Sequence, residues 1–236
     1  MTDRDKPAKP SSRNEVDAFL RKVAMTPAAD TARAGGRLLF AMDATASREP
    51  TWDHACQIQG QMFLETAKIG GLSIQLCYYR GFDEFGSFPW QDSATALLRD
   101  MSSVFCLGGH TQIEKVLQHA IEQTRQKKVD ALVFVGDAME ENIDRLCQRA
   151  GELGLLGVPA FVFQEGDDPL AANAFRSIAR LSNGAYCRFD AGSARQLRDL
   201  LSAVAVYAVG GREALEAFSR RTPPLIRQLT RQLSKS

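Results

Sequence analysis

The sequence has few features of a disulfide-stabilised or membrane-spanning protein. Its five cysteines are far apart and form no CxxC pair, a pattern that argues against a disulfide framework or a zinc knuckle. No segment approaches the roughly 18 consecutive apolar residues of a membrane span. The polar stretch MTDRDKPAKPSSRNE at the start lacks the apolar core of a signal peptide. We therefore expect reduced cysteines and a cytoplasmic protein.

The chain also lacks an excess of charge and the common nucleotide-binding and hydrolase motifs. Its 29 basic and 28 acidic residues give a net charge of +1, which offers no argument for a nucleic acid or an anionic membrane as partner. It has no GxxxxGK[ST] loop, no GxGxxG between a strand and a helix, and no GxSxG nucleophile elbow. The apolar share of 44% is ordinary and suffices for a full core.

Short apolar runs alternate with helical patterns from residue 37 onward. The runs predict strands at residues 37–43, 72–81, 129–137, 158–166 and 185–190. The helical patterns lie at residues 52–71, 93–105, 112–126, 141–154, 169–184 and 193–211. Residues 82–90 predict a tight return or a hairpin with an edge strand. This order favours a three-layer, Rossmann-like α/β fold whose mostly parallel sheet has one antiparallel edge strand.

The chain divides into one domain and two extensions. Residues 1–34 form an N-terminal extension with a disordered start, a short amphipathic helix at 15–25 and a linker. The domain covers residues 35–210. Residues 211–236 form a basic helical tail, in which four apolar residues fall on one helical face: Leu225, Ile226, Leu229 and Leu233. The tail is interpreted as a helix packed on the domain or a frayed end, or alternatively as a docking helix for a partner or a membrane surface.

Oxygen-bearing side chains follow three of the predicted strands and loops. Asp43, Thr45 and Ser47 alternate directly after the first strand, Thr111 begins a helix after a glycine-rich loop, and Asp137 ends the most hydrophobic strand. Alternate residues of an extended segment point the same way, and ligands of open parallel sheets bind beyond the carboxyl ends of the strands. Carboxylates and hydroxyls are ligands of hard cations, so the set favours Mg²⁺ or Mn²⁺ over zinc.

These three pieces resemble the metal-ion-dependent adhesion site (MIDAS) of von Willebrand factor type A (VWA) domains. The stretch from Asp43 to Ser47 resembles the DxSxS or DxTxS signature, and Thr111 and Asp137 match the two later elements in order and separation. The resemblance covers about residues 37–209 and implies a VWA fold. It implies that Thr45, Ser47 and Thr111 bind the ion directly, while the two aspartates act through water. Ala138 departs from the usual glycine, which leaves the backbone of that loop in question.

Other interpretations of the same residues stay open. Each of Asp43, Thr111 and Asp137 alone would be explained as a helix N-cap. Asp43 after an apolar strand also fits an aspartyl nucleophile, but a dehalogenase-type phosphatase needs a second aspartate where Thr45 stands. The runner-up function is therefore a metal-dependent phosphoryl-transfer or hydrolytic enzyme.

Several residues near these motifs have a structural and a functional interpretation. We expect four clustered aromatics to fill the core under the hairpin, rather than to form an exposed contact patch: Phe82, Phe85, Phe88 and Trp90. The acidic run at 137–142 would line the rim of the metal site and is expected to be a solvated helix start. Trp52 is expected to pack at a helix start or to join a binding surface. His110 supports its loop or reaches the rim of the site, and His54 and His119 lie in helical patterns.

The expected function is a non-enzymatic interaction module. No residue in the oxygen set is placed as a nucleophile or a general base. The resemblance implies that the protein binds an Asp or Glu of a partner through Mg²⁺, and that the partner belongs to an ATPase or chaperone machine. No nucleic acid or stable membrane insertion is expected.

Overall fold

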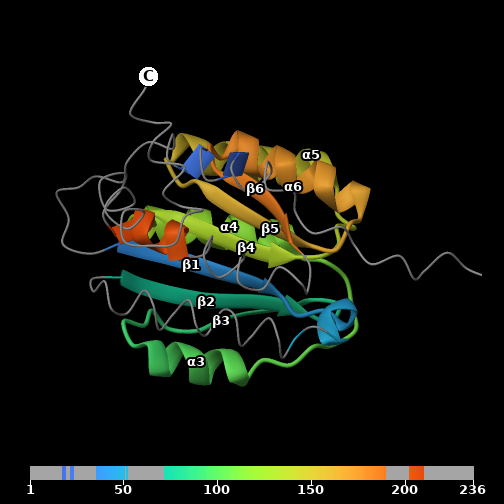
Figure 1. Cartoon of the computed structure of the whole chain (residues 1–236), viewed down its shortest axis with the longest axis horizontal. Helices are drawn as coiled ribbons and strands as arrows, with labels where there is room; N and C mark the ends of the chain where they lie inside the picture. Colours follow the sequence, from blue (N-terminus) through green and yellow to red (C-terminus); the bar gives the residue numbers. More distant parts are fainter. Residues whose placement is uncertain are drawn as a thin grey trace, which may run out of the picture.

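A computed structural model describes residues 18–19, 22–23, 36–50, 52, 72–189 and 202–209. Its centre is a six-stranded sheet with the order β3-β2-β1-β4-β5-β6 (Figure 1). The strands span β1 (Gly36–Asp43), β2 (Leu72–Arg80), β3 (Glu84–Ser87), β4 (Ala131–Gly136), β5 (Ala160–Glu165) and β6 (Ala185–Phe189). All neighbours pair in parallel except β3, which is antiparallel to β2 at the edge.

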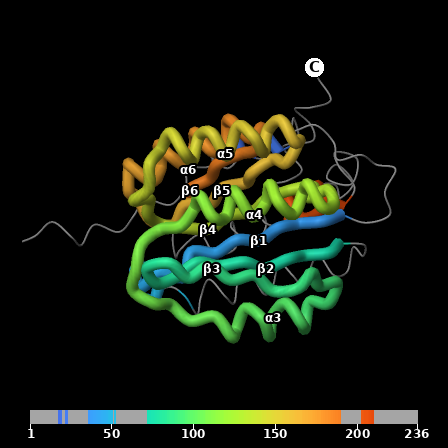
Figure 2. Tube along the Cα trace, turned by 180° about the vertical axis from the view of Figure 1, so that it is seen from behind, coloured from blue at the N-terminus to red at the C-terminus, as the bar shows by residue number. Residues whose placement is uncertain are grey.

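The helices cover both faces of the sheet. They are α3 (Ala94–Ser102), α4 (Ile113–Gln126), α5 (Ile143–Leu155) and α6 (Pro169–Leu181), with a further helical stretch at 202–209. Residues 202–209 lie in front of the sheet in Figure 1, whereas α4 lies in front in Figure 2, which is seen from behind. The predicted three-layer α/β fold is confirmed.

The core is divided by the alternation of side chains along the strands. Phe40 and Met42 of β1 pack on one face with α3 and residues 202–209. Leu39 and Ala41 pack on the other face with α4, α5 and α6. A strand that is buried on both faces is a nearly continuous apolar run, which is why the central residues of β1, β4 and β5 are apolar in the sequence.

Part of the N-terminal extension contributes to this core. Phe19 and Val23 are helical and almost fully buried. The ring of Phe19 lies 5.1 Å from that of Phe163 and 6.2 Å from that of Phe161. The rest of the predicted extension, the predicted helix at 52–71 apart from Trp52, and the tail at 211–236 lie outside the described residues.

The prediction for the aromatic cluster at the sheet edge is only partly right. Phe85, Phe88 and Trp90 are half-buried and pack against the two core clusters. Phe82 instead is 77% exposed, because it lies in the turn between β2 and β3, beyond the paired residues of the hairpin. In the part of the chain that the structure describes, no helix is both long and apolar enough to span a membrane.

Candidate metal and ligand site

Three loops meet where the parallel strands end, at the right of Figure 1. We call residues 43–48 loop 1, residues 103–112 loop 2 and residues 137–142 loop 3. The amide of Leu107 in loop 2 donates to the carbonyl oxygen of Ala44 in loop 1 at 3.0 Å. The amide of Glu140 in loop 3 donates to Thr111 Oγ1 in loop 2 at 3.0 Å. The predicted site residues are therefore distributed over three loops that contact one another.

Asp43 is a fully buried carboxylate in this junction. Its Oδ2 accepts a hydrogen bond from the Tyr79 hydroxyl at 2.7 Å, and its Oδ1 accepts one from the Thr45 amide at 2.8 Å. Burial raises the pKa of Asp43, the charge of Asp137 raises it further, and the hydrogen bonds from Thr45 and Tyr79 oppose the rise. A cation between the two aspartates would offset the burial and the repulsion.

The hydroxyls of Thr45 and Ser47 lie together, as the alternating spacing predicts. Their oxygens are 3.0 Å apart. Thr45 is 6% exposed, whereas Ser47 is exposed. Thr45 precedes the short 3₁₀ turn η1 (Ala46–Arg48), and its side chain makes no capping hydrogen bond there. The two hydroxyls therefore lie side by side on loop 1, with Ser47 at the surface and Thr45 beneath it.

Asp137, at the start of loop 3, carries the second candidate carboxylate. It is not the N-cap of α5, because Asn142 fills that position by accepting from the amides of Asp144 and Arg145. Asp137 Oδ1 is buried and has no hydrogen-bond partner among the described residues. A buried carboxylate oxygen without a partner carries a full desolvation cost, so this atom indicates a place for a cation or a water molecule.

Thr111 is not a helix cap either. The N-cap of α4 is Gln112, and Thr111 is engaged with loop 3 instead. In addition to accepting from the Glu140 amide, Thr111 donates its own amide to Glu140 Oε2 at 3.2 Å. The pair of bonds fixes the threonine beside loop 3 and leaves its hydroxyl proton and a lone pair for another partner.

The acidic run of loop 3 precedes α5 and is partly exposed, as predicted, but Glu141 also binds a second helix. The carboxylate of Glu141 accepts from the amides of Ile113 and Glu114 at 2.6 and 2.8 Å, at the N-terminus of α4 rather than α5. Amides in the first turn of a helix have no partner within the helix and attract a carboxylate. Glu140 and Glu141 therefore attach loop 3 to loop 2.

Two further residues that the sequence did not single out hold loop 1. Tyr79 of β2 donates to Asp43, as described above. Arg48 is buried, with its guanidinium 2.8 Å from the carboxylate of Glu165 at the end of β5. It also donates to the carbonyl oxygens of Asp43 at 3.3 Å and Val135 at 3.4 Å. One side chain thus joins the ends of three strands beneath the site.

Trp52 and His110 have supporting contacts. Trp52 is 9% exposed, and its indole donates to the carbonyl oxygen of Val104 at 3.1 Å, so it packs under loop 2 rather than forming a binding surface. His110 is exposed, its Nδ1 lies 3.2 Å from Glu140 Oε2, and its ring contacts that of Phe82.

Loop 2 approaches the turn after β2 so closely that a larger residue at Gly109 would have to move the backbone of Gly81 or of loop 2. A Cβ at Gly109 would lie 1.8 Å from the carbonyl oxygen of Gly81, whereas a Cβ at Gly108 would meet nothing within 4 Å. Gly109→Ala is expected to lower the free energy of unfolding by roughly 1–3 kcal/mol. Gly108→Ala is expected to change it by about 0.5 kcal/mol at most. Equilibrium unfolding in urea measures both; equal effects would contradict this packing of loop 2.

The donor set fits a hard cation better than a soft one. Among the described residues, no three His, Cys, Asp or Glu side chains are grouped so that they could hold a metal ion. The candidate oxygens on the three loops are two carboxylates and the hydroxyls of Thr45, Ser47 and Thr111. Such a set suits magnesium or manganese, whose remaining positions are commonly filled by water.

Comparisons with known proteins identify the fold. No protein-family model and no curated protein matches the sequence. A von Willebrand factor type A structure from Catenulispora acidiphila matches with a TM-score of 0.60 and 14% identity over 73% of this chain and 43% of that one. The SpRpn10 VWA domain matches with a TM-score of 0.55 and 10% identity over 75% of this chain and 97% of that one.

A third solved structure with a similar fold holds zinc in its own MIDAS motif. It is proximal thread matrix protein 1 from the mussel byssus, described with a zinc-occupied MIDAS motif. It matches with a TM-score of 0.59 and 16% identity over 73% of this chain and 46% of that one. This chain thus spans less than half of two of the three structures, and at these identities the likeness shows the VWA fold.

Proposed function

We propose that this chain is an intracellular interaction module that binds an acidic side chain of a partner protein through Mg²⁺ held at loops 1, 2 and 3. The observation that carries the proposal is the buried Asp137 Oδ1, which has no partner among the described residues. It belongs to a junction where the Thr45 and Ser47 hydroxyls are 3.0 Å apart. An ion there would give that oxygen a partner, directly or through water.

The residues of the site divide into two kinds. Thr45, Ser47 and Thr111 would offer neutral hydroxyl oxygens to the ion. Asp43 and Asp137 would offer the negative charge, through water molecules. The zinc-occupied MIDAS motif of the mussel byssus protein supports a divalent ion at this position of the fold, whereas the oxygen donors here favour Mg²⁺ or Mn²⁺.

The charge balance of the site favours an acidic partner. Two carboxylates that act through water balance the charge of a divalent ion without contacting it directly. The three hydroxyl ligands are neutral. An ion bound in this way remains electrophilic and would accept the carboxylate of an Asp or Glu from another protein. We extend the proposal to a partner in an ATPase or chaperone machine, which would be identified by affinity capture.

The environment of Asp43 supports binding rather than catalysis. Both of its oxygens accept hydrogen bonds, from Tyr79 and Thr45, and the residue has no exposed surface. A carboxylate nucleophile needs a free oxygen facing the substrate. The enzyme alternative therefore has no candidate for the attacking group at this position.

The experiment is affinity capture with and without Mg²⁺, using the wild type, Thr111→Val and Thr111→Ser. Valine keeps the volume of threonine and removes the hydroxyl, whereas serine keeps the hydroxyl and its bond from Glu140. One partner should be retained by the wild type and Thr111→Ser in Mg²⁺, and lost with chelator and in Thr111→Val. Turnover of aryl phosphates or nucleotides in Mg²⁺, abolished by Asp43→Ala, would support the enzyme instead.

A further inference from the structure

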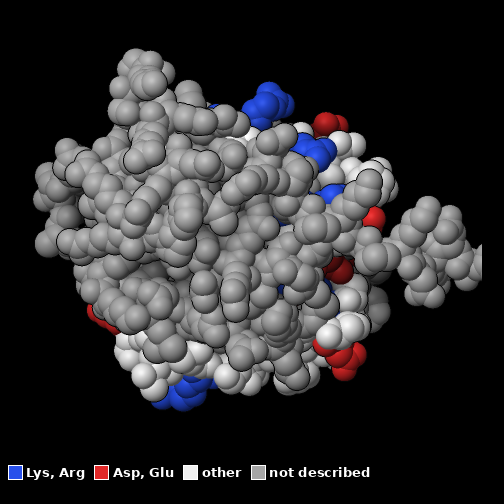
Figure 3. Space-filling view, in the orientation of Figure 1, with Lys and Arg blue, Asp and Glu red and all other residues white. Residues whose placement is uncertain are grey.

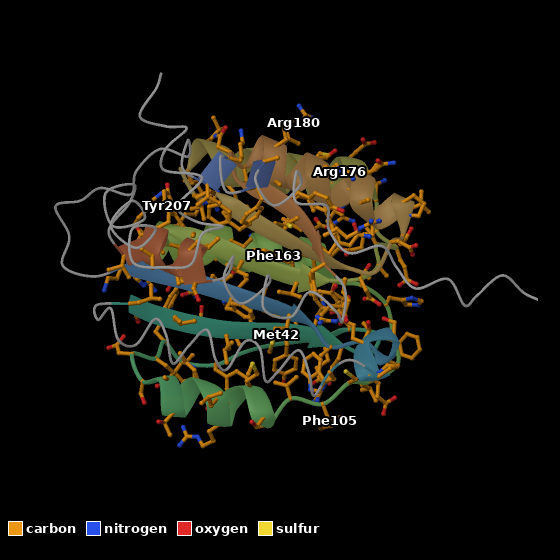
Figure 4. The ribbon with its side chains drawn as sticks, in the orientation of Figure 1. Met42, Phe105, Phe163, Arg176, Arg180 and Tyr207 are labelled. Carbon is orange, nitrogen blue, oxygen red and sulfur yellow. The ribbon has the colours of Figure 1, made fainter. Side chains whose placement is uncertain are left out.

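Large apolar side chains are exposed beside the candidate site. Phe82 is 77% exposed, Phe105 60% and Leu107 45%. They make up half of the six exposed large apolar residues in the described part of the chain; the others are on or beside α5 and α6 (Ile143, Leu155 and Leu170). We call Phe82, Phe105 and Leu107 the apolar rim. In Figure 4 Phe105 lies at the periphery, apart from the buried Met42 and Phe163.

The three residues belong to one surface because loop 2 runs beside the turn that follows β2. The amide of Gly81 donates to the carbonyl oxygen of Leu107 at 3.4 Å, and the amide of His110 donates to the carbonyl oxygen of Gly81 at 3.1 Å. The guanidinium carbon of Arg80 lies 4.0 Å from the ring centre of Phe105. Phe82 follows Gly81 directly, so all three side chains emerge from this pair of segments.

The apolar rim is continuous with the site. Leu107 pairs with Thr45 in an isolated parallel bridge. The ring of Phe82 contacts that of His110, with centroids 5.3 Å apart, and His110 Nδ1 lies 3.2 Å from Glu140 Oε2. The same Glu140 oxygen accepts from the amide of Thr111. A ligand that reaches the hydroxyls of Thr45 and Thr111 therefore has the apolar rim next to it.

The charges around the apolar rim favour a protein segment over an anionic membrane. Among the described residues, two cations beside the apolar rim are paired: Arg80 with Glu84 at 2.7 Å, and Lys115 with Asp83 at 2.6 Å. Loop 3 on the other side presents Glu140, whose side chain is 53% exposed. Acidic side chains are visible together with basic ones along this edge in Figure 3. A negatively charged lipid surface would be repelled here, whereas a single carboxylate on a bound cation would not.

We infer that the partner presents an Asp or Glu together with a neighbouring large apolar residue, and that the apolar residue packs on Phe82, Phe105 and Leu107. The inference rests on the proposed function, since the carboxylate is taken by the ion. Exposed aromatic side chains bury large apolar areas on contact, and such residues commonly dominate the binding energy of an interface. The apolar rim would thus favour those acidic segments that carry a large apolar residue near the carboxylate.

The test uses a displayed library of random dodecapeptides selected on the full chain, in Mg²⁺ and in EDTA. The variants are Phe82→Ser/Phe105→Ser and, as a matched control, Leu155→Ser, which removes an apolar side chain that is 92% exposed on α5. Leu107 is kept because it pairs with loop 1. Mg²⁺ binding is measured on each variant by calorimetry. This measurement distinguishes a variant that no longer binds the ion from one that binds the ion but lacks the apolar contact with the peptide.

The expected result is Mg²⁺-dependent enrichment of peptides with an acidic residue within a few positions of a large apolar one. The best peptide should bind the double variant about tenfold more weakly or worse. It should bind Leu155→Ser like the wild type, and all three proteins should bind Mg²⁺ equally.

Several outcomes would overturn the inference, and they separate it from the proposed function. Enrichment of acidic peptides without an apolar preference, or equal binding by the double variant, would refute the apolar rim and leave the Mg²⁺ site standing. Enrichment unaffected by EDTA, or no Mg²⁺ binding, would refute the proposed function and with it the inference. Binding to phosphatidylserine vesicles, lost in the double variant, would assign the surface to a membrane. A dimer lost in the double variant, without peptide enrichment, would assign it to a second copy of the chain.

Discussion

Asp43→Asn is expected to abolish the stabilisation of the protein by Mg²⁺ while leaving the fold at least as stable as the wild type without metal. Asparagine keeps one oxygen to accept from the Thr45 amide, and its Nδ2 would donate to the Tyr79 hydroxyl oxygen, so both contacts can be retained. It removes a buried charge that is disfavoured by burial and by the charge of Asp137. The substitution thus separates the structural role of Asp43, its hydrogen bonds, from the charge that an ion requires.

Thermal unfolding at increasing Mg²⁺ measures this difference. A ligand at a hundredfold excess over its Kd stabilises the native state by about 2.7 kcal/mol, which raises Tm by roughly 2–4 °C per kcal/mol for a chain of this size. The wild type should show that rise and Asp43→Asn should not. Asp167→Asn, an exposed control, should behave like the wild type. Equal Mg²⁺-dependent rises in wild type and Asp43→Asn would contradict the proposed role of Asp43.

Arg48→Met is expected to cause the largest loss of stability among these substitutions, about 3–5 kcal/mol. The methionine fills similar space but leaves Glu165 without its buried cation and the carbonyl oxygens of Asp43 and Val135 without their donor. Removing one member of a buried pair is costly because the remaining charge has lost both its partner and its water.

A matched surface pair provides the control for Arg48. Arg145 lies 2.9 Å from Glu114, nearly the same distance as in the Arg48–Glu165 pair, but its side chain is 68% exposed. Arg145→Met should therefore cost about 1 kcal/mol at most. Adding Glu165→Gln to Arg48→Met should recover part of the loss, since the uncompensated charge is gone. Equal losses for the two arginine variants in urea unfolding would refute the structural role of Arg48.

The fold could be predicted because its elements have local signatures. β1, β4 and β5 are buried on both faces and are therefore nearly continuous apolar runs, and glycines or polar residues separate them from amphipathic helices. The antiparallel edge strand was indicated by the compact aromatic segment after β2. The position of Phe82 could not be predicted, because the clustering of aromatics does not tell which of them lies in the turn.

The candidate site could be predicted only in part. The spacing of Asp43, Thr45 and Ser47 indicated a common direction, and the two hydroxyls of that group are in contact. The side chains that fix the loops were missed because their partners are distant in sequence: Glu141 bonds to amides 27 and 28 residues away, and Arg48 pairs with a residue 117 positions later. The run at Glu140 and Glu141 resembled an ordinary helix start, and Tyr79 resembled any strand aromatic.

The most direct test of the account is anomalous diffraction from crystals of the full chain grown with Mn²⁺. The account predicts one anomalous peak between loops 1, 2 and 3, at roughly 2 Å from the hydroxyl oxygens of Thr45 and Ser47, with Asp43 and Asp137 linked to it by water. The absence of a peak between the loops, or a peak elsewhere on the chain alone, would contradict it.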